Sequence, residues 1–119
     1  MSYGNPTTVT YRFPAATISA AATIGRFIGP AGLTGKVVDI CSVVTTGVTT
    51  LPGTVTVGTV ADPDSNATLT VAVSAANAVQ NGATKVFEAE LAADTIHVVN
   101  AGGECAAGAA DIIVIVDWS

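Results

Sequence analysis

Residues 112–116 near the C-terminus are five consecutive β-branched residues, Ile-Ile-Val-Ile-Val, with an aspartate on either side. β-Branched side chains have restricted χ1 rotamers and favour the pleated conformation of a strand. An apolar run without alternation is typical of a strand that is buried on both faces. The sequence therefore predicts a strand over residues 111–117 that lies in the interior of a sheet and not at its edge.

The whole chain shares this bias, since 42 of its 119 residues are Val, Thr or Ile. Half of the residues are hydrophobic, which excludes a disordered chain, and a chain of this length can bury roughly two-thirds of its surface in one core. Only 11% of the residues are charged, less than half of the roughly 25% that is usual in globular domains. The composition predicts one β-rich domain whose surface is poor in charge.

Further strands are predicted where apolar and polar residues alternate between turn-forming residues. They are expected within residues 15–28 and over residues 36–46, 54–60, 67–73, 85–91 and 94–100. Gly47 is expected to end the second of these, and residues 74–81 are expected to form a two-turn helix with Ser74 as its N-cap. Strands this closely spaced leave no room for crossover helices, so the predicted fold is an antiparallel β-sandwich or jelly roll with at most one short helix.

Residues 1–14 are predicted to form an extended N-terminal arm in front of a single domain over residues 15–119, and residues 8–13 of this arm have the pattern of a short edge strand. Fully extended, the arm would span at most about 46 Å. Aromatic residues and arginine are the types enriched where protein interfaces concentrate their binding energy. The interface residues predicted on this basis are Tyr3, Tyr11, Arg12 and Phe13 of the arm, with Arg26 and Phe27 nearby. The alternative is that Tyr11 and Phe13 fold back onto their own core.

The charge balance argues against two kinds of partner. The net charge is −5 with only four basic residues, whereas nucleic-acid binding depends on clustered Lys and Arg, so no direct nucleic-acid partner is expected. Residues 40–61 carry no charge but contain seven Thr, three Gly and a Pro, unlike a membrane-spanning helix. The N-terminus also lacks the basic start and apolar run of a secretory signal, so no membrane partner is expected.

Asp62, Asp64 and Asn66 stand at positions 1, 3 and 5 of a calcium-loop pattern. Position 6 is Ala67 where the pattern needs Gly, and position 12 is Val73 where it needs a bidentate Glu. We therefore expect an Asx-type turn at these residues. Residues 29–36 are glycine-rich but lack the spacing of a phosphate-binding loop, and a strand follows where that loop requires a helix, so a bend is expected.

The remaining reactive residues do not form a recognisable catalytic or metal pattern. His97 is the only histidine and is expected to face solvent or an interface. Cys41 and Cys105 are expected to be reduced packing residues, with a bridge between them as the less favoured alternative. Glu88 and Glu90 share one face of a predicted strand and are expected to be solvated. The sequence thus predicts a protein that is not an enzyme and has no cofactor.

Four stretches of the sequence resemble a group of small bacteriophage proteins, the cement or decoration proteins on the outer surface of icosahedral heads. These stretches are residues 32–40, 55–64, 92–99 and 107–118. They run from Gly32 to near the C-terminus, about three-quarters of the chain, and consist of strand and turn phrases. The resemblance implies a jelly-roll-like fold, homotrimers at three-fold and quasi-three-fold positions of the capsid, and no enzymatic activity.

The function expected from these observations is that of a virion structural protein, which forms a homotrimer on the outer surface of the capsid and clamps neighbouring major capsid subunits. One alternative is a head or tail fibre module or another receptor-facing virion protein, which would need exposed aromatic residues at a tip; the position of Trp118 at the extreme C-terminus weakens it. Another is a small cellular binding domain, dependent on calcium at Asp62.

Overall fold

The computed structural model describes residues 7–80, the backbone of residues 85–86, and residues 90–119. No residue in these ranges is helical. The chain forms the strands β1 (Thr7–Thr17), β2 (Ala22–Ile28), β3 (Gly35–Thr49), β4 (Gly53–Thr59), β5 (Ala67–Val71), β6 (Val79–Gln80), β7 (Lys85–Val86), β8 (Ile96–Ala101) and β9 (Ala107–Trp118).

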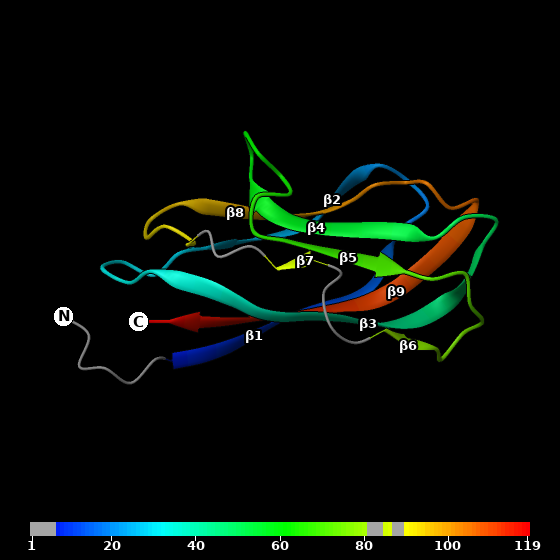
Figure 1. The fold of residues 1–119 in the computed structure, drawn as a ribbon, viewed down its shortest axis with the longest axis horizontal. Helices are drawn as coiled ribbons and strands as arrows, with labels where there is room; N and C mark the ends of the chain where they lie inside the picture. The colour runs from blue at the N-terminus through cyan, green and yellow to red at the C-terminus, as the bar shows by residue number, and fades with distance from the viewer. Residues whose placement is uncertain (1–6, 81–84, 87–89) are drawn as a thin grey trace.

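The strands form two antiparallel sheets that pack face to face, the arrangement of a β-sandwich (Figure 1). One sheet has the order β1-β9-β3-β6 and the other has the order β2-β8-β4-β5-β7. Among the described strands, only β4 and β5 are consecutive in the sequence and also neighbours in one sheet, as in a hairpin. The predicted all-β antiparallel sandwich is confirmed.

The C-terminal strand β9 lies between β1 and β3 and pairs with both along its length. Its interior position in the sheet, predicted from the β-branched run, is therefore confirmed. Burial alternates along the strand, however. Ile112, Val114 and Val116 are completely buried against the second sheet, whereas Ile113 and Ile115 are half-buried on the outer face. The prediction that both faces are covered is wrong for the described chain.

The core between the sheets is built from the alternating residues of the central strands. Val55 and Val57 of β4 are completely buried, as are Leu69 and Val71 of β5. This is the face that the period-two patterns of residues 54–60 and 67–73 predict. Val73 lies beyond the end of β5 and is exposed, since the chain there has already turned towards the other sheet.

Strand β3 does not end at Gly47, as predicted, but continues to Thr49. A Cβ atom at position 47 would lie 3.4 Å from the carbonyl oxygen of Ser74. This is an ordinary contact distance, so the space at this position does not require a glycine. β3 continues past Gly47 because Val48, the next residue, pairs with Ser74 through its backbone.

The helix predicted over residues 74–81 is wrong for residues 74–80, where the chain forms a bridge, a turn and β6. Ser74 and Val48 exchange two backbone hydrogen bonds of 2.9 and 3.1 Å. Further along, Asn77 donates to the carbonyl of Val44 at 2.7 Å, and Val44 donates to that of Ala78 at 2.9 Å. The backbone groups that a helix would use internally are instead paired with the edge of β3.

Residues 7–14 of the predicted N-terminal arm belong to β1, which pairs with β9 from Thr7 to Thr17. The side chains of Val9, Tyr11 and Phe13 are half-buried and pack against the core. Over this range the arm is thus a strand of the domain, and Tyr11 and Phe13 take the second of the two arrangements that the sequence allows. Tyr3 and the rest of residues 1–6 lie outside the described residues.

Candidate functional site

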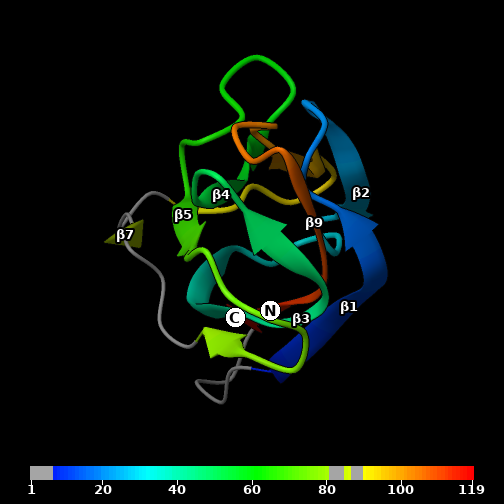
Figure 2. The ribbon, with the colours of Figure 1, turned by 90° about the vertical axis from the view of Figure 1, so that its right-hand side faces the viewer.

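The outermost strands β1 and β2 of the two sheets lie next to each other on one side of the sandwich (Figure 2). In the described chain β1 pairs only with β9, and β2 pairs only with β8, so each strand has one unpaired side. The opposite side of the sandwich ends in β6 and β7, which have two residues each, whereas β1 has eleven and β2 has seven. We call the side formed by β1 and β2 the β1/β2 edge.

The hydrogen-bond register shows which backbone groups of β1 are unpaired. Thr34 and Ser119 exchange two backbone hydrogen bonds of 2.9 Å each, and antiparallel pairs alternate between bonded and non-bonded residues. This pair lies on the β3 side of β9. Along β9 the bonding alternates from residue to residue between the β3 side and the β1 side, so every second residue of β9 bonds to β1. In β1, the residues that alternate with the bonded ones turn their N–H and C=O groups to the unpaired side. They are Thr8, Thr10 and Arg12.

The same reasoning applies to β2. The N–H of Gly29 donates to the carbonyl of Thr95 at 3.0 Å, in register with the pairing of Phe27 and His97. By alternation, the backbone groups of Arg26 point away from β8. The β1/β2 edge therefore carries two short rows of unpaired backbone donors and acceptors, one from each sheet. Such rows are templates for the addition of another strand.

Aromatic contacts join the two strands across the sandwich. The rings of Tyr11 and Phe27 are stacked, with centroids 4.3 Å apart and an interplanar angle of 17°. Phe27 also meets Trp118 edge-on at 6.4 Å. The indole Nε1 of Trp118 donates a hydrogen bond of 3.1 Å to the hydroxyl oxygen of Tyr11. These contacts hold β1 next to β2, so the edge is one continuous surface built from both sheets.

The ring of Phe13 lies directly over Gly25, and a Cβ atom at position 25 would overlap that ring. Gly25 sits at an irregularity in the pairing of β2 with β8, between Thr23 and Gly25. The missing side chain lets β1 and β2 approach each other here. Beyond this contact a cavity of about 300 Å³ opens between β1 and β2 and is lined by residues on either side of Phe13 and Thr23.

A β-bulge at Pro14 and Ala15 shapes the outer face of β1. The register with β9 shifts between Phe13 and Ala16, and Ala15 has a φ angle of 49°, in the left-handed region. The bulge turns the Ala15 N–H towards Asp111, whose Oδ1 accepts it at 2.7 Å, while Oδ2 accepts Arg12 Nη2 at 3.0 Å. The hydrogen bond from Ala15, followed by that from Arg12, lowers the pKa of Asp111.

This arrangement predicts the acid titration of Asp111. Because the pKa is lower in the folded protein than in the unfolded chain, the contacts stabilise the fold above the unfolded value, and this stabilisation is lost as the pH falls through the folded value. We expect NMR titration of the carboxyl carbon to give a midpoint below the ordinary 3.8. In Arg12→Gln the midpoint should rise but stay below 3.8, because the Ala15 contact is retained. A return to 3.8 would show that the bulge contact is not formed in solution.

The structure brings together most of the residues predicted as interface residues. Tyr11, Arg12 and Phe13 lie on β1, and Arg26 and Phe27 lie on β2. Their roles differ, because Phe27 is buried and the tyrosine and phenylalanine of β1 are half-buried, whereas both arginines are exposed. The aromatic residues thus build the edge, and the arginines lie on its two outer faces.

Sequence reasoning missed the exposed residues of the edge itself. Thr8 and Thr10 alternate with Val9 and Tyr11 in the sequence, so a period-two signal was present and would have separated outward from inward residues. The apolar pair Ile28 and Ile96, opposite each other on β2 and β8 and both exposed, carried no such signal. It is formed by two strands that are far apart in the sequence.

Of the three polar residues at the predicted Asx-type turn, Asp62 and Asp64 lie close to each other, whereas Asn66 is buried. Asn66 is 2% exposed, and its Oδ1 accepts a hydrogen bond from Ser65 Oγ at 2.9 Å. Asp62 and Asp64 are exposed at the end of the loop between β4 and β5. A hydrogen bond with Asp64, followed by burial and the negative charge of Asp64, raises the pKa of Asp62. The N–H of Asp62 donates to Thr59 Oγ1 at 3.1 Å, a local turn contact.

His97 is 1% exposed, so the prediction that it faces solvent is wrong. Its ring lies in the core, with centroids 5.4 Å from Phe27 and 6.3 Å from Trp118. Nε2 lies 3.0 Å from the carbonyl oxygen of Ala92, to which it donates a hydrogen bond in the corresponding tautomer. The histidine faces inward because it occupies the same face of β8 as the buried Val99.

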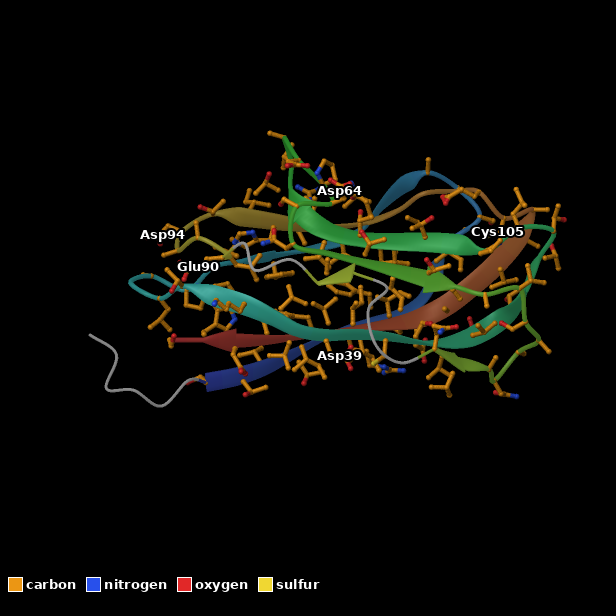
Figure 3. The ribbon with its side chains drawn as sticks, in the orientation of Figure 1. Asp39, Asp64, Glu90, Asp94 and Cys105 are labelled. Atoms are coloured by element: carbon orange, nitrogen blue, oxygen red, sulfur yellow. The ribbon has the colours of Figure 1, made fainter. Side chains whose placement is uncertain are left out.

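Both cysteines are free, as predicted, and Cys105 is buried. Burial, followed by the negative charge of Asp39, raises the pKa of the Cys41 thiol. Glu90 is exposed, and Glu88 lies outside the described residues. Figure 3 shows that the labelled acidic side chains are spread over the molecule, with Asp64 on the β4–β5 loop, Asp39 on β3, and Glu90 and Asp94 near one end.

In the described ranges, no three His, Cys, Asp or Glu side chains are grouped so that they could hold a metal ion. Those ranges also contain no helix long and apolar enough to cross a membrane. Comparison of the chain with protein-family models, with curated proteins and with solved structures found no match in any of the three.

Proposed function

We propose that this protein is a non-enzymatic structural subunit of a virion, a cement protein that binds to the outer surface of a phage head and holds neighbouring major capsid subunits together. The observation that carries the proposal is the β1/β2 edge, where two sheets end side by side in long strands with unpaired backbone groups. The sequence resemblance to head decoration proteins supports it independently.

An unpaired edge can bind a partner by accepting an extended segment as an additional strand. On β1 the incoming segment would bond to Thr8, Thr10 and Arg12, which are three successive outward positions before the bulge at Pro14. Isolated proteins usually protect long edges with charges, bulges or short strands, because an exposed edge promotes aggregation. Residues 7–13 carry only one charge, that of Arg12, so the edge fits a surface that is covered in an assembly.

The low charge of the chain fits the same proposal. Several large apolar side chains are more than half exposed, and they are spread over both sheets and the connecting loops: Ile28, Val38, Leu51, Val60, Val73 and Val79. Threonine hydroxyls account for much of the remaining polar surface on β1. Net surface charge keeps free proteins from associating. A protein that binds to a shell and to its own copies needs less of this charge than a protein that remains free.

In the proposed assembly three copies form a ring, and each copy binds one capsid subunit. The second and third contacts then form at a high effective concentration, so weak single contacts give stable binding of the trimer. The fibre alternative would need exposed aromatic residues for carbohydrate stacking, and the ring of Trp118 is 1% exposed. The residues available in the described chain thus favour the clamp over the fibre module.

The test is the mass of the purified protein by light scattering, followed by its binding to heads assembled without it. We expect a mass three times 11.7 kDa and saturable binding to the outer surface of the heads. A monomer at all concentrations, together with an absence of head binding, would refute the proposal. Truncation should remove residues 1–6 only, because residues 7–14 form β1 and their loss would remove a strand of the domain.

A further inference from the structure

Arg26 is a cation without an ion-pair partner among the described residues of an acidic protein. Of the four basic residues, Arg12 forms an ion pair with Asp111, and Lys36 lies opposite Asp117 in the pairing of β3 with β9. Arg26 is exposed on β2 and forms no ion pair with any described residue, although the chain has nine acidic residues and a net charge of −5. Its guanidinium is therefore available to an external anion.

A pocket of about 240 Å³ lies beside Arg26 on the outer face of the second sheet. It is lined by Thr23 and Arg26 of β2, Val98 and Asn100 of β8, and Val60 after β4. Val98 is 5% exposed although it is on the outer face, because its neighbours cover it. The lining thus combines one cation and two polar side chains with two valines, and no acidic side chain of the described residues is part of it.

Asn100 lines the same pocket and contributes an amide side chain to it. Its Oδ1 atom is buried and has no hydrogen-bond partner among the described residues. An amide oxygen accepts hydrogen bonds, so this atom does not itself recognise an anion. The NH₂ group of the same side chain is the group that can donate to an acceptor bound in the pocket.

We propose that this pocket binds the carboxylate side chain of an acidic residue on the capsid protein, an inference that rests on the proposed function. The guanidinium fork of Arg26 matches a carboxylate in shape and charge and can donate two parallel hydrogen bonds. The Asn100 amide and the Thr23 hydroxyl are further donors beside it. The volume is below the roughly 300–1,000 Å³ of small-molecule sites, so it suits one side chain whose methylene groups contact Val60 and Val98.

The test uses N-acetyl-glutamate α-amide as a probe and N-acetyl-glutamine α-amide as its neutral counterpart. We expect the glutamate probe to shift the NMR signals of the Arg26 Nε–H and the Asn100 side-chain amide in a saturable way. The glutamine probe should not shift them. Binding should weaken about tenfold or more in Arg26→Gln, corresponding to about 1.4 kcal/mol, and remain unchanged in the matched control Arg12→Gln.

Equal shifts with both probes, or shifts that persist in Arg26→Gln, would overturn the proposed carboxylate pocket. Tighter binding of inorganic phosphate than of the glutamate probe would also overturn it, since the site would then be a general anion site. The test is separate from that of the proposed function. If the wild-type protein does not bind heads but binds the probe through Arg26, the cement proposal fails while the pocket remains. If heads bind and the probe does not, only the pocket fails.

Discussion

Replacing Trp118 by alanine is expected to lower the free energy of unfolding by about 3–5 kcal/mol, the range for removing a large buried aromatic side chain. Trp118 is 1% exposed and touches both sheets, through Tyr11 on β1 and Phe27 on β2. It also lies flat on Gly35, where a Cβ atom would be 2.6 Å from the indole ring. Since domains of this size are stable by only about 5–15 kcal/mol, the loss is a large part of the total.

Chemical denaturation of purified variants measures this effect. Trp118→Phe keeps most of the ring but removes the hydrogen bond to Tyr11, so it should cost less than the alanine variant. Leu51→Ala is the matched control, because Leu51 is an exposed apolar residue at the β3–β4 turn and its change should stay within about 0.5 kcal/mol. Equal effects of the two alanine variants would show that Trp118 does not connect the sheets.

Replacing Thr10 by proline is expected to weaken binding to heads strongly while leaving the domain folded. The Thr10 N–H points to the unpaired side of β1, and proline is tolerated in an edge strand at such a position. The substitution removes one backbone donor from each contact with the shell. At about 0.5–1.5 kcal/mol per hydrogen bond, this is up to about tenfold per contact and up to about a thousandfold for a trimer with three contacts.

Thr10→Ala is the matched control for this prediction, because it removes the hydroxyl and keeps the backbone N–H. Co-sedimentation with heads measures binding, and thermal unfolding confirms that each variant is folded. If Thr10→Pro binds as well as the wild-type protein, the shell does not add a strand to β1. If Thr10→Ala loses binding to the same extent, the side chain and not the backbone makes the contact.

Much of the fold could be predicted because the strand signals are local. The alternation over residues 54–60 and 67–73 marks β4 and β5 to within two residues, and it identifies Val55, Val57 and Leu69 as core residues. Period-two alternation depends only on the residues of one strand, so it survives without knowledge of the neighbours. The interior position of β9 followed from its apolar composition in the same way.

The predictions that failed depend on neighbours that are distant in the sequence. Gly47 has the local character of a strand end, but the backbone pairing of Val48 with Ser74 extends β3 beyond it. The local sequence of residues 74–80 favours a helix, but their backbone groups form hydrogen bonds with the edge of β3 instead. His97 alternates in sequence like an exposed residue, yet its face of β8 turns towards Trp118. In each case tertiary pairing overrides the local preference.

The sequence by itself determined that the chain is an all-β domain, where most of its strands lie, and that its surface is poor in charge. It also selected Tyr11, Arg12, Phe13, Arg26 and Phe27 by residue type. Only the tertiary structure decided that these residues meet at one edge, that the aromatic rings build it, and that Arg26 lies beside a pocket to which the described residues contribute no acidic side chain. The physical reason is that strand alternation is a property of neighbouring residues, whereas an edge is defined by pairing between residues as far apart as Thr7 and Trp118.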